Sequence, residues 1–307
     1  MTSPVRLLGM MGMGVLWLTM NATQAAPTAY EAALAANNPY ALYHFTDSGS
    51  ILTDSSGNAH NGAYFGSPTL GTTGYGGGSD TATYFNANSQ YASLTGANSF
   101  GSSLGSSTIA FLLSTNSSAL GVLLGETQNA TNDAFSITLN SNSSGTLSAG
   151  TTRIFIRADT LADTFSATFT NAALYSGNFV DLTFTFDLTS STPVTVYVNG
   201  VAQTLGSVTN KLTSADTFSA LGNSFFVAAA DVRGSTTAAN LAASAVTIDE
   251  LALYSTVLTA TQVQANVATL SAVPEPSPLA LAGFGVLAFA CAAAARRSAR
   301  PRHQEIA

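Results

Sequence analysis

The sequence has little charge: only 8% of its 307 residues are Asp, Glu, Lys or Arg, whereas about 25% is typical of soluble domains. The stretch from Pro27 to Ala272 holds four basic and fourteen acidic residues, a formal charge of −10. A surface so short of Lys and Arg cannot neutralise phosphates, which excludes nucleic-acid binding. Hydrophobic residues still make up 46% of the chain, which is enough for a core. These numbers indicate a neutral, hydroxyl-rich globular protein.

Cysteine and histidine are also scarce. Cys291 is the only cysteine, so neither an intrachain disulfide nor a cysteine-based metal site can form. The histidines are His44, His60 and His303, and no Gly-x-Ser-x-Gly motif precedes a predicted helix. Serine and cysteine nucleophile chemistry of the triad type is therefore not expected.

The N-terminus has the features of a secretory signal peptide over residues 1–25. Arg6 provides the positive charge, and an apolar run from Leu7 to Met20 follows. That run is short for a transmembrane helix. Cleavage between Ala25 and Ala26 is expected, because a cut after Ala26 would place a proline immediately beyond it. We therefore predict export through the inner membrane.

The C-terminus has three parts: a proline-punctuated hinge over 273–278, an apolar run over 279–295 and a basic cluster over 296–302. The apolar run reaches the lower limit for a membrane-spanning helix, and the arginines after it predict a cytoplasmic C-terminus. The prolines keep the hinge extended. The residues that define this tail are Val273, Pro274, Glu275 and Pro276 in the hinge, and Arg296 and Arg297 at the membrane stop.

This arrangement resembles the PEP-CTERM sorting tail of Gram-negative bacteria. The resemblance covers about the last 35 residues and implies processing by an exosortase, a membrane protease that cuts near Pro-Glu-Pro. The protein would then contact the inner membrane transiently and end at the cell surface or outside the cell. The alternative is a simple tail anchor that keeps the protein in the inner membrane, facing the periplasm.

Between the two ends, period-2 patterns predict β-strands. In Val180–Leu188 apolar residues occupy the even-numbered positions and polar residues the odd-numbered ones. This alternation predicts a strand with one face in a core and the other in solvent. Asn199-Gly200 predicts a tight hairpin. Two short helices are expected, over 29–36 and from Thr259, where Thr259 and Gln262 have capping-box spacing. Further strands are expected at Thr108–Leu113, Gly121–Gly125, Phe135–Leu139, Arg153–Arg157, Phe165–Phe169, Phe225–Ala229 and Val246–Tyr254.

About a dozen short strands separated by turn residues favour an all-β, two-sheet antiparallel sandwich in one domain over residues 26–272. Four blocks resemble concanavalin A-like, laminin-G-type jelly rolls in their order: 40–64, 81–94, the Asn-Gly hairpin and 246–266. Residues from about Phe100 to Asn178 contain no block that aligns. The resemblance implies a jelly roll that binds glycans or proteins, but it identifies no ligand-binding loop.

Three functions follow from this resemblance. The protein is expected to be a non-catalytic carbohydrate-binding, adhesive or structural protein whose partner is an extracellular polysaccharide. The alternative is a glycoside hydrolase or another polysaccharide-active enzyme, which needs two carboxylates about 5–5.5 Å apart if it retains configuration. The Glu-x-Asp-x-Glu array of the related glucanases is missing, and Asp249 and Glu250 are expected to point to opposite faces because they are adjacent. We therefore predict no catalysis.

The third function is that of a scaffold with a structural calcium ion. The resemblance implies an ion that ties the first strand to the last, with Asp54, Asn58 and Asp249 as oxygen ligands. The alternative is that Asp54 to Asn58 simply form a turn. The glycine-rich stretch from Gly74 to Asp80 lacks the residues of a phosphate loop, so a loop between strands is expected there. Five tyrosines are candidates for stacking on sugars, and half or more of them are expected to be core or edge residues: Tyr64, Tyr75, Tyr84, Tyr91 and Tyr254.

Overall fold

The computed structural model describes residues 28–77, 79–127, 134–218, 225–229 and 245–270. The predicted signal peptide with its cleavage site at Ala25 and Ala26, and the predicted sorting tail with its hinge, apolar run and arginines, lie outside the described residues. Among the residues that are described, no helix combines the length and hydropathy needed to cross a bilayer.

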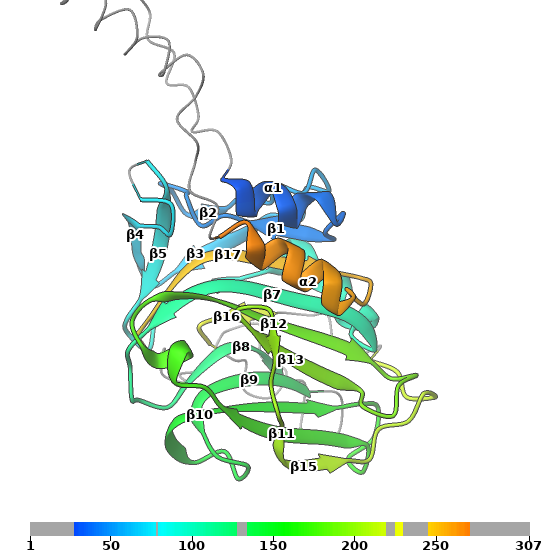
Figure 1. The fold of residues 1–307 in the computed structure, drawn as a ribbon. Helices are drawn as coiled ribbons and strands as arrows, with labels where there is room; N and C mark the ends of the chain where they lie inside the picture. The colour runs from blue at the N-terminus through cyan, green and yellow to red at the C-terminus, as the bar shows by residue number, and fades with distance from the viewer. Residues whose placement is uncertain (1–27, 78, 128–133, 219–224, 230–244, 271–307) are drawn as a thin grey trace, which may run out of the picture.

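Two antiparallel sheets stack to form the body of the protein (Figure 1). In the eight-stranded sheet, the last core strand β17 (Val246–Tyr254) pairs with β7, β5 and the short first strand β1. The strand order is β14 (Val201–Ala202), β13 (Val194–Val198), β12 (Phe179–Asp187), β7 (Ser106–Thr115), β17, β5 (Thr81–Phe85) and β4 (Thr69–Thr73), with β1 (Ala41–Tyr43) also against β17.

The second sheet has nine strands. Its order is β15 (Gly206–Asn210), β11 (Thr164–Thr170), β10 (Leu147–Arg157), β9 (Ala134–Ser141), β8 (Gly121–Thr127), β16 (Phe226–Val227), β6 (Tyr91–Ser93), β3 (Gly62–Phe65) and β2 (Ile51–Leu52). Two 3-10 helices, η1 (Thr95–Ser103) and η2 (Ala172–Tyr175), connect strands. The predicted all-β, two-sheet antiparallel jelly-roll sandwich is confirmed.

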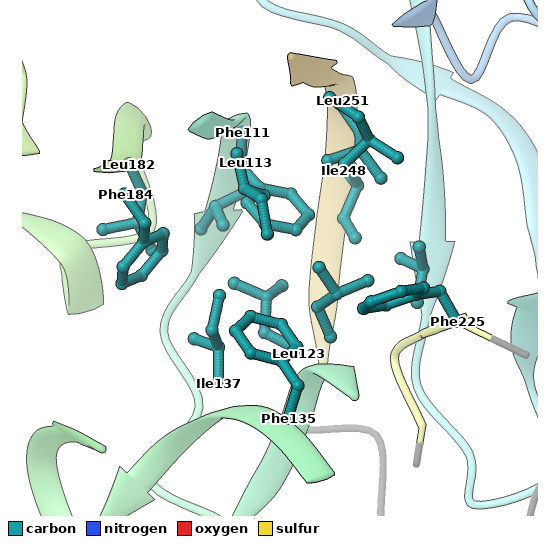
Figure 2. Close-up of a cluster of buried hydrophobic side chains, with 14 of the residues drawn as sticks. Phe111, Leu113, Leu123, Phe135, Ile137, Leu182, Phe184, Phe225, Ile248 and Leu251 are labelled. Carbon is teal, nitrogen blue, oxygen red and sulfur yellow. The ribbon is translucent and has the colours of Figure 1, made fainter. Parts of the chain in front are cut away.

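The core lies between the two sheets. Figure 2 shows Phe111, Leu113, Leu182, Phe184, Ile248 and Leu251 of the eight-stranded sheet facing Leu123, Phe135 and Ile137 of the nine-stranded sheet. The alternate apolar residues of β12 point into this core as predicted, and all four are buried: Val180, Leu182, Phe184 and Phe186. Burial of each such side chain contributes about 1.5–3 kcal/mol, which makes this layer the main source of stability.

The other face of β12 is not in solvent, and the prediction for it is wrong. Asp181, Thr183 and Thr185 are only 1%, 2% and 6% exposed. Two helices, α1 (Ala29–Ala36) and α2 (Ala260–Ala268), lie over the outer face of the eight-stranded sheet (Figure 1). Apolar side chains from both helices and the sheet form a second, smaller core there: Tyr30, Leu34, Leu42, Ala110, Leu112, Tyr197, Ala252, Tyr254, Leu258 and Val263.

Local sequence signals explain how both helices and the hairpin begin. Thr28 caps α1, because its hydroxyl accepts a hydrogen bond from the Glu31 amide. Thr259 and Gln262 form the predicted capping box of α2. Asn199 and Gly200 have φ angles of 50° and 73°, the left-handed pair that joins two strands through a type I′ turn. The expected helix over 29–36, the capping box at Thr259 and the Asn199-Gly200 hairpin are thus confirmed.

Candidate functional site

The nine-stranded sheet presents its second face away from the core, and one row of residues crosses all nine strands on that face. Each member is the direct partner of the next. Both sequence neighbours enter the core at five members: Ser93, Phe226, Ser136, Phe155 and Ser166. We call this the outer row: Ile51, Ala63, Ser93, Phe226, Gly125, Ser136, Phe155, Ser166 and Thr209. Six of the nine members are Ala, Gly, Ser or Thr, so the row is rich in small and hydroxyl-bearing residues. Ser93 and Phe226, near its middle, are buried at 3% and 1% exposed.

Aromatic side chains stand at both ends of the outer row. At one end, Phe65 is 44% exposed and stacks on Tyr91 with ring centroids 4.9 Å apart, while the Phe226 ring lies edge-on to Tyr91. At the other end, the Arg153 guanidinium lies over the Phe155 ring, 4.8 Å from its centroid. Aromatic rings with polar groups nearby provide the apolar surface and the orienting contacts that a small polar ligand needs.

Two polar atoms on this face lack a partner. Arg153 Nε and Ser166 Oγ are both buried, and neither makes a hydrogen bond within the chain. They are diagonal neighbours across β10 and β11, since Ser166 pairs with Phe155 and Arg153 with Thr168. Burial lowers the pKa of the Arg153 guanidinium. An unsatisfied buried donor costs about 1–3 kcal/mol unless something supplies the missing partner. An oxygen-rich ligand on the outer row would supply it.

A cavity of about 360 Å³ lies at the edge of the sandwich, lined by residues of β11, β13 and the segment that leads to β15. Its amide side chains already have partners. Gln203 is bonded to Asn171 and to the Val201 carbonyl, and Asn210 accepts from the Leu212 amide. The outer row, where polar atoms remain unpaired, is therefore the better candidate for ligand binding.

Asp54 and Asn58, two of the predicted calcium ligands, form a turn next to β1. One Asp54 oxygen accepts from the Leu42 and Ser56 amides, and the other accepts from the His60 amide and the Ser56 hydroxyl. Burial opposes ionisation of Asp54, but these hydrogen bonds outweigh it and lower the pKa of the carboxyl. Asn58 donates to two backbone carbonyls. Because the carboxylate lone pairs are already used, this arrangement does not fit a calcium ion.

Asp249, the third predicted ligand, lies in β17 at a β-bulge. The pairing of β17 with β7 shifts between Ile248 and Glu250. Ile248 and Leu251 both enter the core, so the two residues between them share the opposite side. The expectation that Asp249 and Glu250 point to opposite faces is therefore wrong. Both are buried, with exposures of 0% and 2%.

The environment of these two carboxyls favours their neutral form. Burial raises the pKa of Asp249 to about 8, although the Tyr75 amide donates to its Oδ2. Burial, followed by the charge of Asp249, raises the pKa of Glu250 well above its usual range. One oxygen of each carboxyl, Asp249 Oδ1 and Glu250 Oε2, has no hydrogen-bond partner. Sequence reasoning missed this site because the bulge has no signal in the pattern of β17.

The five tyrosines differ in exposure, and Tyr84 is half-buried in β5. Tyr64 and Tyr254 are buried at 8% and 0%, and Tyr91 is the one that joins the aromatic end of the outer row. Tyr75 is 40% exposed, and its hydroxyl donates to the Leu270 carbonyl. The alternation of Arg153, Phe155 and Arg157 could have predicted which residues lie on the outer face of β10. It could not have predicted that Arg153 Nε and Ser166 Oγ are buried without a partner.

Comparison with known proteins places the domain in a family. Residues 86–264 match Laminin_G_3, described as the concanavalin A-like lectin/glucanases superfamily. The match covers β6 to the start of α2 and includes every strand that contributes Arg153, Phe155 and Ser166 to the candidate site. A search of curated proteins gives no match.

Several solved structures have a similar fold. One is the receptor-binding domain of the botulinum neurotoxin C/D mosaic serotype, with 12% identity and a TM-score of 0.53 over 75% of this chain and 51% of that one. Another is described as "Cell entry of botulinum neurotoxin type C is dependent upon interaction with two ganglioside molecules", with 12% identity and a TM-score of 0.53 over 78% and 53%. This chain thus spans about half the length of these structures. At such identity the likeness concerns the fold.

Proposed function

Because the chain belongs to the concanavalin A-like lectin/glucanase superfamily, we propose that it is a non-catalytic carbohydrate-binding protein that holds a glycan on the outer row. The observation that carries this proposal is the pair of unsatisfied polar atoms, Arg153 Nε and Ser166 Oγ, beside the Phe155 ring. A sugar offers an apolar ring face for the aromatic side chain and hydroxyl oxygens for the two polar groups. The neurotoxin whose cell entry depends on two gangliosides gives a precedent for glycan recognition on a similar fold.

Binding, rather than hydrolysis, agrees with where the carboxylates lie. The outer row contains no acidic residue, whereas retaining hydrolysis needs two carboxylates about 5–5.5 Å apart on either side of the scissile bond. Asp249 and Glu250 do lie together, but they are buried on the opposite sheet, beneath α1 and the loop before β5. A polysaccharide cannot reach them there. Asp249 and Glu250 are therefore separated from the proposed ligand surface by the thickness of the sandwich.

Export and sorting complete the proposal. The N-terminal signal peptide and the Pro-Glu-Pro tail with its arginine cluster direct the chain outward and expose it to an exosortase. The processed protein would carry its carbohydrate-binding face at the cell surface or in the extracellular polymer. The low charge and the abundance of hydroxyl residues suit a protein that works among neutral polysaccharides.

A glycan array with the full chain tests the binding proposal. We expect binding to at least one class of bacterial polysaccharide fragment. R153Q and F155A should each weaken it by about 5- to 150-fold, since each removes about 1–3 kcal/mol of contact. The matched control is Q264A, because Gln264 is an exposed polar residue of α2, which covers the other sheet. Wild-type binding that persists in both variants, or an array with no signal above background, would refute the proposal.

A further inference from the structure

We propose that Glu31, His44 and Glu250 form a binding site for one divalent transition-metal cation, of which zinc is the best example. The site would join α1, the first helix of the chain after the predicted signal peptide, to the last core strand β17. It is independent of the glycan site, because it lies on the other sheet.

The geometry of the three side chains carries the proposal. One ligand atom from each of Glu31, His44 and Glu250 lies within 4.8 Å of the other two. His44 Nδ1 and Glu31 Oε2 are 3.9 Å apart, too far for a hydrogen bond. Two ligands of a tetrahedral zinc ion, each about 2.1 Å from the metal, lie about 3.4 Å apart. The His44–Glu31 pair would have to contract by about half an ångström, and no pair by more than about 1.4 Å, to complete the site.

The atoms that face this space are buried and unpaired. Glu250 Oε2 and His44 Nδ1 are both inaccessible to solvent, and neither has a hydrogen-bond partner. The Glu250 side chain is 2% exposed. Leaving such atoms unsatisfied is costly, and a buried carboxylate more so than a neutral group. A cation between them would satisfy the carboxylate and the imidazole together.

The surroundings supply negative charge and no positive charge. Asp249 and Asp80 add negative charge close to Glu250 and Glu31. The described basic residues are Arg153, Arg157 and Lys211. Arg153 and Arg157 lie on β10 of the other sheet, and Lys211 follows β15. None of these three described basic residues is in the sheet that holds the site, and a divalent ion would compensate the carboxyls in their ionised form.

The ligand types favour a transition metal over calcium. Calcium takes six to eight oxygen ligands, whereas imidazole together with carboxylates suits zinc and its neighbours. The neutral imidazole is the form that coordinates a metal, and His44 Nδ1 is buried without a hydrogen-bond partner among the described residues. Three protein ligands also leave a position for water.

A second group of three acidic residues lies at the surface and lacks the buried, unpaired atoms of the proposed metal site. Asp159, Asp163 and Asp216 also lie within ligand distance of one another, but they are exposed or half-buried, and nearby threonine hydroxyls donate to each of them. Nothing there points to an ion. This surface group is useful as a control for nonspecific binding by acidic residues.

The test uses the full chain, stripped with a chelator and then titrated with zinc at pH 7.5. We expect one zinc equivalent to remain bound, as measured by elemental analysis, and the melting temperature to rise by about 5–10 °C when free zinc exceeds its Kd 100-fold. H44Q should lose both responses. E250Q should also lose both responses. Without zinc, however, E250Q should melt at the same temperature as the zinc-free wild type or at a higher one, because the amide replaces a buried acid. That last result separates loss of the site from loss of the fold.

Two controls complete the design. H60Q removes the other described histidine, and D216N changes the surface acidic group. Both should respond to zinc as the wild type does. The proposal would be overturned by a melting temperature insensitive to zinc, by zinc stabilisation that survives in H44Q, or by stabilisation with calcium alone that is the same with and without His44.

Discussion

Asp181 offers the sharpest test of how the helices cover the eight-stranded sheet. Its side chain is 1% exposed, and it accepts hydrogen bonds from the Tyr30 hydroxyl at 2.6 Å and the Thr183 hydroxyl at 3.0 Å. Burial raises the pKa of Asp181 to about 6, even though both hydrogen bonds lower it. The folded protein therefore binds a proton more tightly at this site than the unfolded chain does.

The size and sign of the effect follow from that pKa. The shift from 3.8 to about 6 is about two pKa units, and each unit corresponds to about 1.4 kcal/mol. For a carboxyl whose pKa is raised in the folded state, the stabilisation is complete below pH 4 and is lost as the pH rises through 6. Asp181 should thus lower the free energy of unfolding by about 3 kcal/mol between pH 4 and pH 7.

The measurement compares wild type with D181N by urea unfolding at several pH values. Asn cannot ionise, so the difference in unfolding free energy between the two proteins should change by about 3 kcal/mol across this window. The lost acceptor for Tyr30 or Thr183 costs the variant a nearly constant amount and cancels. Because the only tryptophan, Trp17, lies in the predicted signal peptide, unfolding is followed by far-UV circular dichroism. A difference that stays constant from pH 4 to pH 7 would refute the burial of Asp181 under α1.

Two further predictions concern the turn after β3 and the C-terminal tail. G66A should destabilise the protein by at least about 2 kcal/mol, because a Cβ there would lie 1.8 Å from the Ser89 carbonyl oxygen at a φ of +71°. G49A, where nothing lies within 4 Å, should change stability by less than about 0.5 kcal/mol, and equal unfolding midpoints for the two variants would contradict this account. The exported protein should have a mass that corresponds to a start at Ala26 and an end near Pro274–Pro276. A product that keeps residues 279–302 in cells with and without an exosortase would show a simple anchor instead.

Much of the fold could be predicted because its signals are local. The alternation in β12, the Asn199-Gly200 turn and the Thr259 capping box each depend on a few adjacent residues, and the structure confirms them. The two-sheet class followed from counting such strands.

What the sequence did not reveal depends on contacts between distant segments. The polar face of β12 was expected in solvent, but residues 29–36 and 260–268 cover it. Alternation shows that a strand has two different faces and cannot show what packs on the second one. Asp181 is buried there because Tyr30, 151 residues away, donates to it.

The candidate sites show the same limit. The adjacent acids of β17 share one side only because a bulge interrupts the pairing with β7, and the sequence contains no marker for it. The outer row requires the register of nine strands to bring Phe155 beside Ser166 and both into line with Phe226. Each residue alone looks like an ordinary member of a half-exposed strand.

The most direct test of the carbohydrate-binding proposal is the NMR signal of the Arg153 Nε–H group. This proton has no acceptor among the residues that the structure describes, so a glycan oxygen on the outer row should shift its resonance and slow its exchange with water. The titration uses the oligosaccharide that binds best on the array. Saturable changes at Arg153 Nε–H and at the Ser166 amide, with none around the edge cavity near Gln203, are the predicted result. An unchanged Arg153 signal at a glycan concentration that saturates binding would contradict the account.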